Sequence, residues 1–139
     1  MTSQSSSDSA ITTGVGGGEA CSGEGFVAAT EDAGMLFGGF LYFALASIEA
    51  PSDDLAIEIY SDLGMAGART VLEENYATCD PCVLLRLDCD DNLDNCSKRF
   101  LARSGTLDIT SFAGTFVGEL RDAELVEVTI DGNANSTPV

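Results

Sequence analysis

The sequence contains no histidine, no tryptophan and only six lysine and arginine residues. Without histidine, neither a Ser-His-Asp nor a Cys-His catalytic site can be built, and catalytic zinc loses its imidazole ligands. Without tryptophan, an aromatic platform for stacking a sugar needs Tyr42, Tyr60 or Tyr76. These absences remove much of the usual catalytic inventory, so we expect a protein that is not an enzyme.

The shortage of basic residues leaves the chain strongly acidic. The chain has 23 Asp and Glu residues and six Lys and Arg residues, which gives a formal net charge of −17. Nucleic-acid binding requires clustered Lys and Arg that displace counterions from phosphate, so a nucleic-acid partner is excluded. Hydrophobic residues still make up 45% of the 139 residues, which is enough for one domain with a buried core.

No hydrophobic run is long enough to cross a bilayer as a helix. The most apolar stretch, Met35–Ile48, has 14 residues, whereas a membrane-spanning helix needs about 20. Gly38 and Gly39 interrupt this stretch, and Phe, Tyr and Leu dominate the residues after them. We therefore expect a buried strand over residues 40–48, with a short core helix as the alternative, and no membrane span.

A sustained period of 3.6 residues is also missing, whereas a period of two residues recurs. It is clearest in Leu55–Ser61, which places Leu55, Ile57 and Ile59 on one face and Ala56, Glu58 and Tyr60 on the other. Further strands are expected at 69–72, 83–89, 115–120 and 125–130, at 100–103 and 106–111 joined by a hinge at 104–105, and in a short first segment at 26–30. A turn is expected at 50–54 and a turn or bulge at 121–124. Seven to eight short strands separated by Gly, Asp, Asn and Ser turns predict an all-β fold, an antiparallel β-sandwich or a jelly roll.

Residues 1–25 differ from the rest in composition. They are rich in Ser, Thr and Gly and hold almost nothing apolar, which predicts a disordered tether. A single β-sandwich domain is expected over residues 26–139. The chain opens without the basic and apolar regions of a signal peptide, and we expect that an export leader is absent from this chain.

Five cysteines suit an oxidising compartment better than the cytosol. Four of them lie within Asn75–Phe100, where disulfides are the leading interpretation: Cys79, Cys82, Cys89 and Cys96. Cys79–Cys82 would form a tight local bridge and Cys89–Cys96 would close an acidic loop, although four cysteines allow three pairings. This leaves over Cys21, which could link subunits. The alternatives are a zinc or iron–sulfur site and a redox C-x-x-C, but spacing and acidic neighbours disfavour them.

The acidic loop of residues 88–95 is a candidate calcium site. Oxygen-bearing side chains alternate there, as they do in calcium loops: Asp88, Asp90, Asn92 and Asp94. Leu93 occupies the position where an EF-hand has glycine, and Arg99 the position of its bidentate glutamate, so an EF-hand is rejected. A looser calcium site stays open beside the plainer interpretation, a solvated acidic hairpin loop.

Several segments resemble uncharacterised secreted or lipid-anchored β-rich proteins of myxobacteria and their relatives. These segments are NYATCDPCVLL (75–85), SGTLDIT (104–110), GTFVGEL (114–120), VEVTID (126–131) and STPV (136–139). The resemblance covers about residues 35–139. It implies an extracytoplasmic location and a β-rich fold, and it implies no activity.

Taken together, these features predict a non-enzymatic extracytoplasmic domain, secreted or at the cell surface, that works in surface structure or adhesion. Its partners would be itself, through exposed strand edges, or other surface proteins. The alternative is a small binding module whose acidic loop 88–95 recognises calcium or another cationic ligand. A hydrolase built on carboxylates alone is the third hypothesis, and it requires a cleft that holds two of them.

Overall fold

A computed structural model describes residues 30–36, 38–47, 50–71, 75–90, 95–112 and 116–139. The predicted tether of residues 1–25, with Cys21, lies outside these ranges, as do Asn92, Asp94 and the first four residues of the strand predicted at 26–30. The strands are β1 (Thr30–Leu36), β2 (Gly39–Leu45), β3 (Ser52–Ile59), β4 (Gly67–Val71), β5 (Cys82–Cys89), β6 (Lys98–Ser111), β7 (Val117–Ile130) and β8 (Ser136–Pro138).

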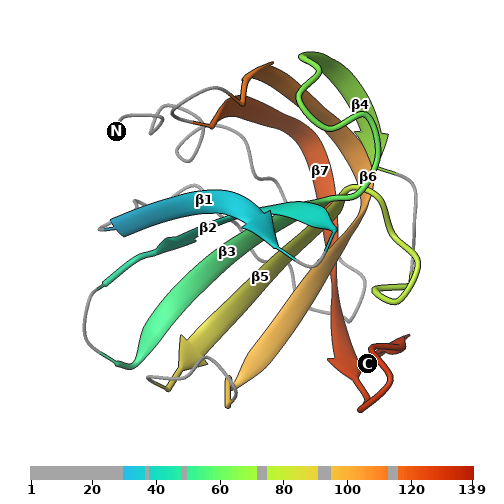
Figure 1. The fold of residues 1–139 in the computed structure, drawn as a ribbon. Coiled ribbons are helices and arrows are strands. Elements are labelled where there is room, and N and C mark those ends of the chain that lie inside the picture. The colour runs from blue at the N-terminus through green and yellow to red at the C-terminus, as the bar shows by residue number, and fades with distance from the viewer. Residues whose placement is uncertain (1–29, 37, 48–49, 72–74, 91–94, 113–115) are drawn as a thin grey trace.

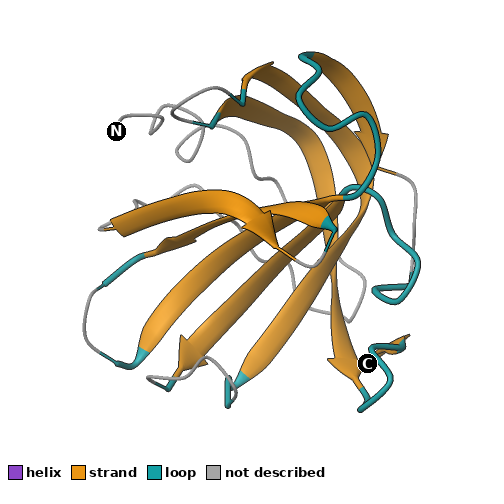
Figure 2. Cartoon of the chain, viewed as in Figure 1, coloured by secondary structure: helices purple, strands orange, loops and turns teal. Residues whose placement is uncertain are grey.

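The prediction of an all-β, antiparallel fold is confirmed (Figure 2). Every pair of neighbouring strands is antiparallel, and the described residues contain no helix. All eight strands belong to one hydrogen-bonded sheet in the order β1-β2-β3-β5-β6-β7-β8, with β4 paired to β6. The sheet curls over, so that β4 and the adjoining halves of β6 and β7 arch above β1, β2 and β3 (Figure 1). The result is sandwich-like, but both layers come from a single continuous sheet.

The curl comes from the two longest strands. β6 pairs with β5 along its first half and with β4 along its second half, while β7 follows both halves on the other side. Register shifts on either side of Ser104 mark bulges in this pairing, and bulges bend a sheet. Gly105 has φ +131°, and a Cβ there would lie 2.8 Å from Cα of Ala123. The predicted hinge at 104–105 is therefore a bend inside one continuous strand.

The main core fills the concave side of the sheet. Buried side chains of β2, β3 and β5 meet those of β6 and β7 there. The aromatic ring of Phe116, which leads into β7, lies 5.3 Å from that of Phe40 and 5.2 Å from that of Tyr42, both on β2. The alternating residues Leu55, Ile57 and Ile59 all enter this core, as their period of two predicts.

A second, smaller apolar cluster lies on the outer, convex side of the sheet. It contains Ala56, Cys79, Cys82, Leu84, Leu101 and Val128, and Tyr76 packs against it. Residues 75–81, which lead into β5, supply two of these side chains, Tyr76 and Cys79. The outer face of the sheet is thus covered in part by a segment without regular structure.

Some predicted boundaries were wrong. β1 occupies Thr30–Leu36, so the start of the apolar run Met35–Ile48 belongs to β1 and its middle to β2, with Gly38 turning the chain at φ +80°. β3 begins at Ser52, inside the segment predicted as a turn, because Ser52 and Asp54 pair with β5. In the part of the chain that the structure describes, no helix is long and apolar enough to cross a membrane.

Candidate functional site

The candidate site is built on the end of β3. Side chains two residues apart in a strand share a face, so Glu58 and Tyr60 both lie on the outer side of the sheet. The Tyr60 hydroxyl donates a 2.5 Å hydrogen bond to Oε1 of Glu58. The ring of Tyr60 lies against Gly39 of β2, where a Cβ would come within 2.6 Å of ring atom Cδ1. A larger residue at position 39 would displace the ring.

The second half of the site comes from the segment before β5. Asn75 organises this segment, since its Oδ1 accepts hydrogen bonds from the backbone N–H groups of Ala77 (3.0 Å) and Ser136 (3.1 Å). The Tyr76 N–H donates to Oγ of Ser136 at 2.8 Å. The segment is thereby tied to β8, which fixes the position of the Tyr76 side chain.

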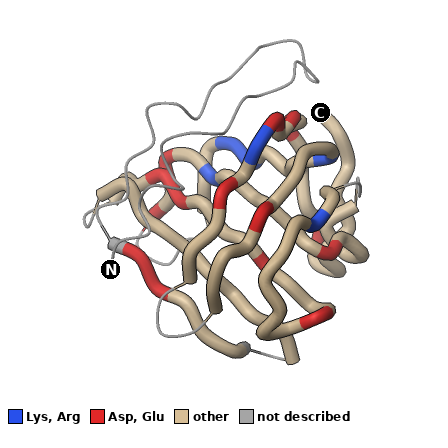
Figure 3. Tube along the Cα trace, turned by 90° about the horizontal axis from the view of Figure 1, so that it is seen from above, with Lys and Arg blue, Asp and Glu red and all other residues tan. Residues whose placement is uncertain are grey.

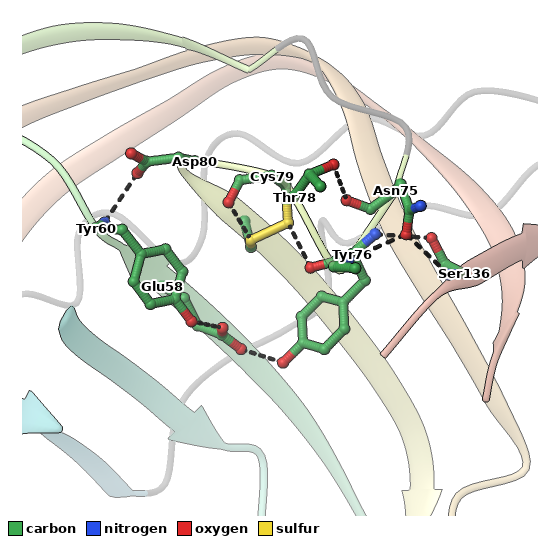
Figure 4. The surroundings of a disulfide bond; sticks show 10 residues. Glu58, Tyr60, Asn75, Tyr76, Thr78, Cys79, Asp80 and Ser136 are labelled. Carbon is green, nitrogen blue, oxygen red and sulfur yellow. Dashed lines mark hydrogen bonds between the residues drawn. A yellow bond between two sulfur atoms is a disulfide. The ribbon is translucent and has the colours of Figure 1, made fainter. Parts of the chain in front are cut away.

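Both tyrosines meet the same carboxylate (Figure 4). The Tyr76 hydroxyl donates a hydrogen bond to Oε2 of Glu58, while Tyr60 occupies Oε1. The Tyr60 N–H donates to Oδ1 of Asp80 at 2.8 Å. Tyr60 therefore holds one carboxylate with its backbone and another with its side chain.

These residues surround a solvent-open hollow with a volume of about 550 Å³. We call it the tyrosine hollow; its lining includes Glu58, Tyr60, Tyr76, Thr78, Cys79 and Asp80. Tyr60 is 48% exposed, so its ring is accessible from solvent. Cys79, which is paired with Cys82, is part of this lining.

The tyrosine hydroxyls remain donors over the physiological pH range. Burial, followed by the hydrogen bond to Glu58 and the charges of Glu58 and Asp80, raises the pKa of Tyr60 to about 12. Burial and the same carboxylate raise the pKa of Tyr76, and Arg86 opposes this shift. Neither phenol loses its proton near neutral pH, so the two hydrogen bonds to Glu58 persist.

The hollow is negatively charged. Among the described residues that line it, the charged ones are Glu58 and Asp80, both acidic. Arg86, whose charge reaches Tyr76, is paired with Asp54 through a 2.6 Å hydrogen bond from Nε and a salt bridge from Nη2. Asp and Glu are spread over the described strands, whereas Lys and Arg are few (Figure 3). Cations are attracted to such a site and anions are repelled.

Of the three pairings that four cysteines allow, the structure has the expected one, in which Cys79 pairs with Cys82 and Cys89 with Cys96. The Sγ atoms of Cys79 and Cys82 lie 1.95 Å apart and those of Cys89 and Cys96 lie 2.16 Å apart, which are disulfide distances. The first pair stands beside the tyrosine hollow, and the second closes the acidic loop.

The calcium prediction for the acidic loop stays a prediction. Asp88 accepts a hydrogen bond from the Ser97 hydroxyl at 3.0 Å, and Asp90 accepts one from the Asn95 amide at 2.7 Å. The other two predicted ligands, Asn92 and Asp94, lie outside the described residues. Within the described residues, no group of three or more His, Cys, Asp and Glu is placed to hold a metal ion.

The tyrosine hollow was not predicted from the sequence, although two features of the sequence indicate some of its residues. The alternation of Leu55–Ser61 places Glu58 and Tyr60 on one face, and the lack of tryptophan singles out the tyrosines. Tyr42 is in the core at 2% exposure, whereas Tyr60 and Tyr76 meet at the hollow. Only the folded chain brings Tyr76 to Glu58.

No family model, curated protein or solved structure matches this chain.

Proposed function

We propose that this protein is a non-enzymatic extracytoplasmic domain that works in adhesion at a cell surface, and that it binds through the tyrosine hollow. The observation that carries the proposal is the arrangement of Tyr60 and Tyr76 on the two oxygens of Glu58 in a solvent-open hollow. Tyrosine offers a large, rigid contact surface at a small cost in conformational entropy, which is why it is enriched in binding sites.

The extracytoplasmic location is supported by the cysteines. Two pairs at disulfide distance suit an oxidising compartment, because cytosolic thiols are kept reduced. The location is also what the resemblance to secreted or lipid-anchored β-rich proteins implies. Intact mass spectrometry of protein exported to an oxidising compartment tests it: reduction is expected to add four hydrogen atoms for the two described pairs, and free thiols at these positions would contradict it.

Adhesion is assigned to the hollow because a described sheet edge is protected. β1 pairs only with β2 among the described strands, so its other side is an edge. The N–H of Ala33 on β1 already donates to Oδ1 of Asp32 at 2.9 Å. Acidic side chains on an edge strand oppose pairing with another strand. Self-association through this edge is thereby disfavoured, and we propose other surface molecules as the main partners.

The adhesion test compares beads that carry the wild-type protein with beads that carry the double variant Tyr60→Leu, Tyr76→Leu. Bacterial cells and beads coated with this same protein serve as the two probe surfaces. We expect the double variant to retain about tenfold fewer cells, the effect of truncating anchoring aromatic side chains. Met65→Ala, at an exposed residue outside the hollow, is the control. Equal retention by the double variant, or wild-type retention no better than that of bare beads, contradicts the proposal.

A carboxylate hydrolase is the second candidate, because Glu58 and Asp80 both line the hollow. Glycoside hydrolysis requires two carboxyl groups, of which one must donate a proton. Here Glu58 accepts hydrogen bonds on both oxygens and Asp80 accepts one from the Tyr60 backbone, so both carboxylates are engaged as acceptors within the protein. We expect no release of nitrophenol from nitrophenyl glycosides; turnover abolished by Glu58→Gln would establish the hydrolase instead.

A further inference from the structure

The tyrosine hollow combines negative charge with aromatic surface. Its charged lining residues are Glu58 and Asp80, and its aromatic lining residues are Tyr60 and Tyr76. We infer that it binds an alkylammonium group, the group that ends a lysine side chain. This inference rests on the proposed function, since it names the ligand class of the same site.

The Glu58 carboxylate can accept more hydrogen bonds than the two tyrosine hydroxyls supply. A carboxylate offers about four acceptor positions on its two oxygens. The hydroxyls of Tyr60 and Tyr76 use one position on each oxygen. An ammonium group carries three N–H donors, so it can occupy the remaining positions and form charge-assisted hydrogen bonds.

The two tyrosine rings suit the rest of the ligand. A cation near the face of an aromatic ring is attracted by the negative potential of that face. Each phenol here donates its hydrogen to a carboxylate, and such hydrogen bonding further polarises the group that donates. The alkyl chain next to the nitrogen can lie along the rings, as lysine stems do on apolar surfaces.

Other ligand classes fit the hollow less well. Anions are repelled by two carboxylates and by the net charge of −17. Calcium requires about six to eight oxygen ligands around one point, whereas the described lining brings two carboxylates whose oxygens already accept hydrogen bonds. A neutral sugar would use the rings but would leave the charge without a counterpart. The alkylammonium group uses both features.

The experiment is an NMR titration of the ¹⁵N-labelled full chain with n-butylammonium chloride, at constant ionic strength maintained with sodium chloride. We expect saturable shifts at the backbone amides of Tyr60, Tyr76 and Thr78, with a dissociation constant in the millimolar range. 1-Butanol, which has the same chain without the charge, should produce no saturable shifts. Tetramethylammonium, which has no N–H donors, should bind more weakly than n-butylammonium. Nα-acetyl-lysine methylamide should cause the same shifts as n-butylammonium.

Two variants distinguish the charge in the hollow from the overall charge of the protein. Glu58→Gln keeps the size of the side chain but removes its charge, and it is expected to weaken n-butylammonium binding by about tenfold. Asp122→Asn removes one negative charge outside the hollow, at a residue with φ +56° that asparagine tolerates, and should leave binding unchanged. Equal weakening in both variants would overturn the inference, because only the overall charge would then matter.

The remaining outcomes separate this inference from the proposed function. If methyl glucoside shifts these amides and n-butylammonium does not, the ligand class is wrong while the hollow remains a binding site. If bead adhesion depends on the hollow but no alkylammonium probe binds, the inference likewise fails and the proposed function stands. If n-butylammonium binds but adhesion survives the loss of both tyrosines, the ligand class stands and the adhesive function fails.

Discussion

The Tyr76 hydroxyl donates a hydrogen bond to Oε2 of Glu58, across 18 residues of sequence, and so ties a loop to the outer face of β3. Tyr60 approaches the other oxygen of the same carboxylate. One glutamate thereby sets the positions of two aromatic rings. The chemistry of the hollow depends on this residue, and the first two predictions concern it.

The ionisation of Tyr60 should depend on Glu58. Its pKa is raised to about 12 by burial and by Glu58, against a usual value of 10.0. Because the folded state keeps a proton that the unfolded state releases, stability should fall as pH rises from about 10 to about 12. Glu58→Gln removes the carboxylate charge, so the Tyr60 titration midpoint should drop. Titration followed by ¹³C NMR of labelled tyrosine measures it, and an unchanged midpoint would refute the contact.

Gly39→Ala should displace the Tyr60 ring. The new methyl group would lie within 2.6 Å of Cδ1 and 3.0 Å of the Ile59 carbonyl oxygen, so the ring must move. We expect a cost of about 1–3 kcal/mol in stability from overpacking, together with a lower Tyr60 pKa. Gly34→Ala on β1, where a Cβ meets nothing within 4 Å, is the matched control. A Tyr60 pKa that responds equally in both variants would contradict this account.

Loss of either cysteine pair should lower stability, but loss of only one pair should weaken ligand binding. Replacing either pair by serine is expected to destabilise the protein by about 2 kcal/mol, the chain-entropy value for short loops, as measured by chemical denaturation. Only loss of the pair at Cys79 and Cys82 should weaken n-butylammonium binding, because it borders the hollow. If loss of the pair at Cys89 and Cys96 weakened binding as much, the weakening would come from general destabilisation of the fold, and the prediction would be wrong.

Arg86→Met should be far more destabilising than Arg103→Met. Asp54 is fully buried and paired with Arg86, whereas Arg103 and its partner Glu124 are 40% and 37% exposed. Removing the partner of a buried carboxylate lowers the free energy of unfolding by about 3–5 kcal/mol. Removing one partner of an exposed ion pair lowers it by at most about 1 kcal/mol. Urea denaturation of the two variants compares these costs directly.

The cost of Arg86→Met should also depend on pH. Burial raises the pKa of Asp54 above 3.8, and Arg86 opposes the shift. Without Arg86 the pKa rises further, so the folded variant holds its proton to higher pH than the unfolded chain does. Stability relative to wild type should therefore be lower at about pH 7 than at about pH 4. A cost that is the same at both pH values would contradict the burial of a charged Asp54.

Calcium should not stabilise the protein specifically. Asp88 and Asp90 already accept hydrogen bonds from Ser97 and Asn95, so both carboxylates are engaged in contacts within the protein. A ligand that binds only the folded state raises the melting temperature. We expect millimolar calcium to raise it no more than magnesium does at the same concentration. If the melting temperature rose with calcium but not with magnesium, and the rise were lost in Asp90→Asn, the acidic loop would be a calcium site.

Local patterns in the sequence predicted what depends on local structure. The alternation of Leu55–Ser61 gave the correct core face of β3, and the short spacings made Cys79–Cys82 and Cys89–Cys96 natural pairs. Gly105 marked the bend of β6. Each of these features depends on residues close together in the chain.

Features that depend on distant residues were not predictable. The hydrogen bond between Tyr76 and Glu58 requires β3, β5 and β8 to be in place, and no local pattern encodes it. The same holds for Ser52 at the start of β3, which is in the strand because β5 pairs with it. The burial of Asp54 was not predictable either. The sequence around it is typical of a polar turn, and its partner Arg86 lies on a different strand, β5.

The most direct test of the central claim is the adhesion of cells to beads that carry the wild-type protein, Glu58→Gln or Asp122→Asn. The two variants lose the same charge, but only the first alters the carboxylate shared by Tyr60 and Tyr76. Adhesion through the tyrosine hollow predicts that Glu58→Gln beads retain several-fold fewer cells while Asp122→Asn beads match the wild type. Equal retention by all three kinds of bead would show that the protein adheres through another surface, or not through this chemistry at all.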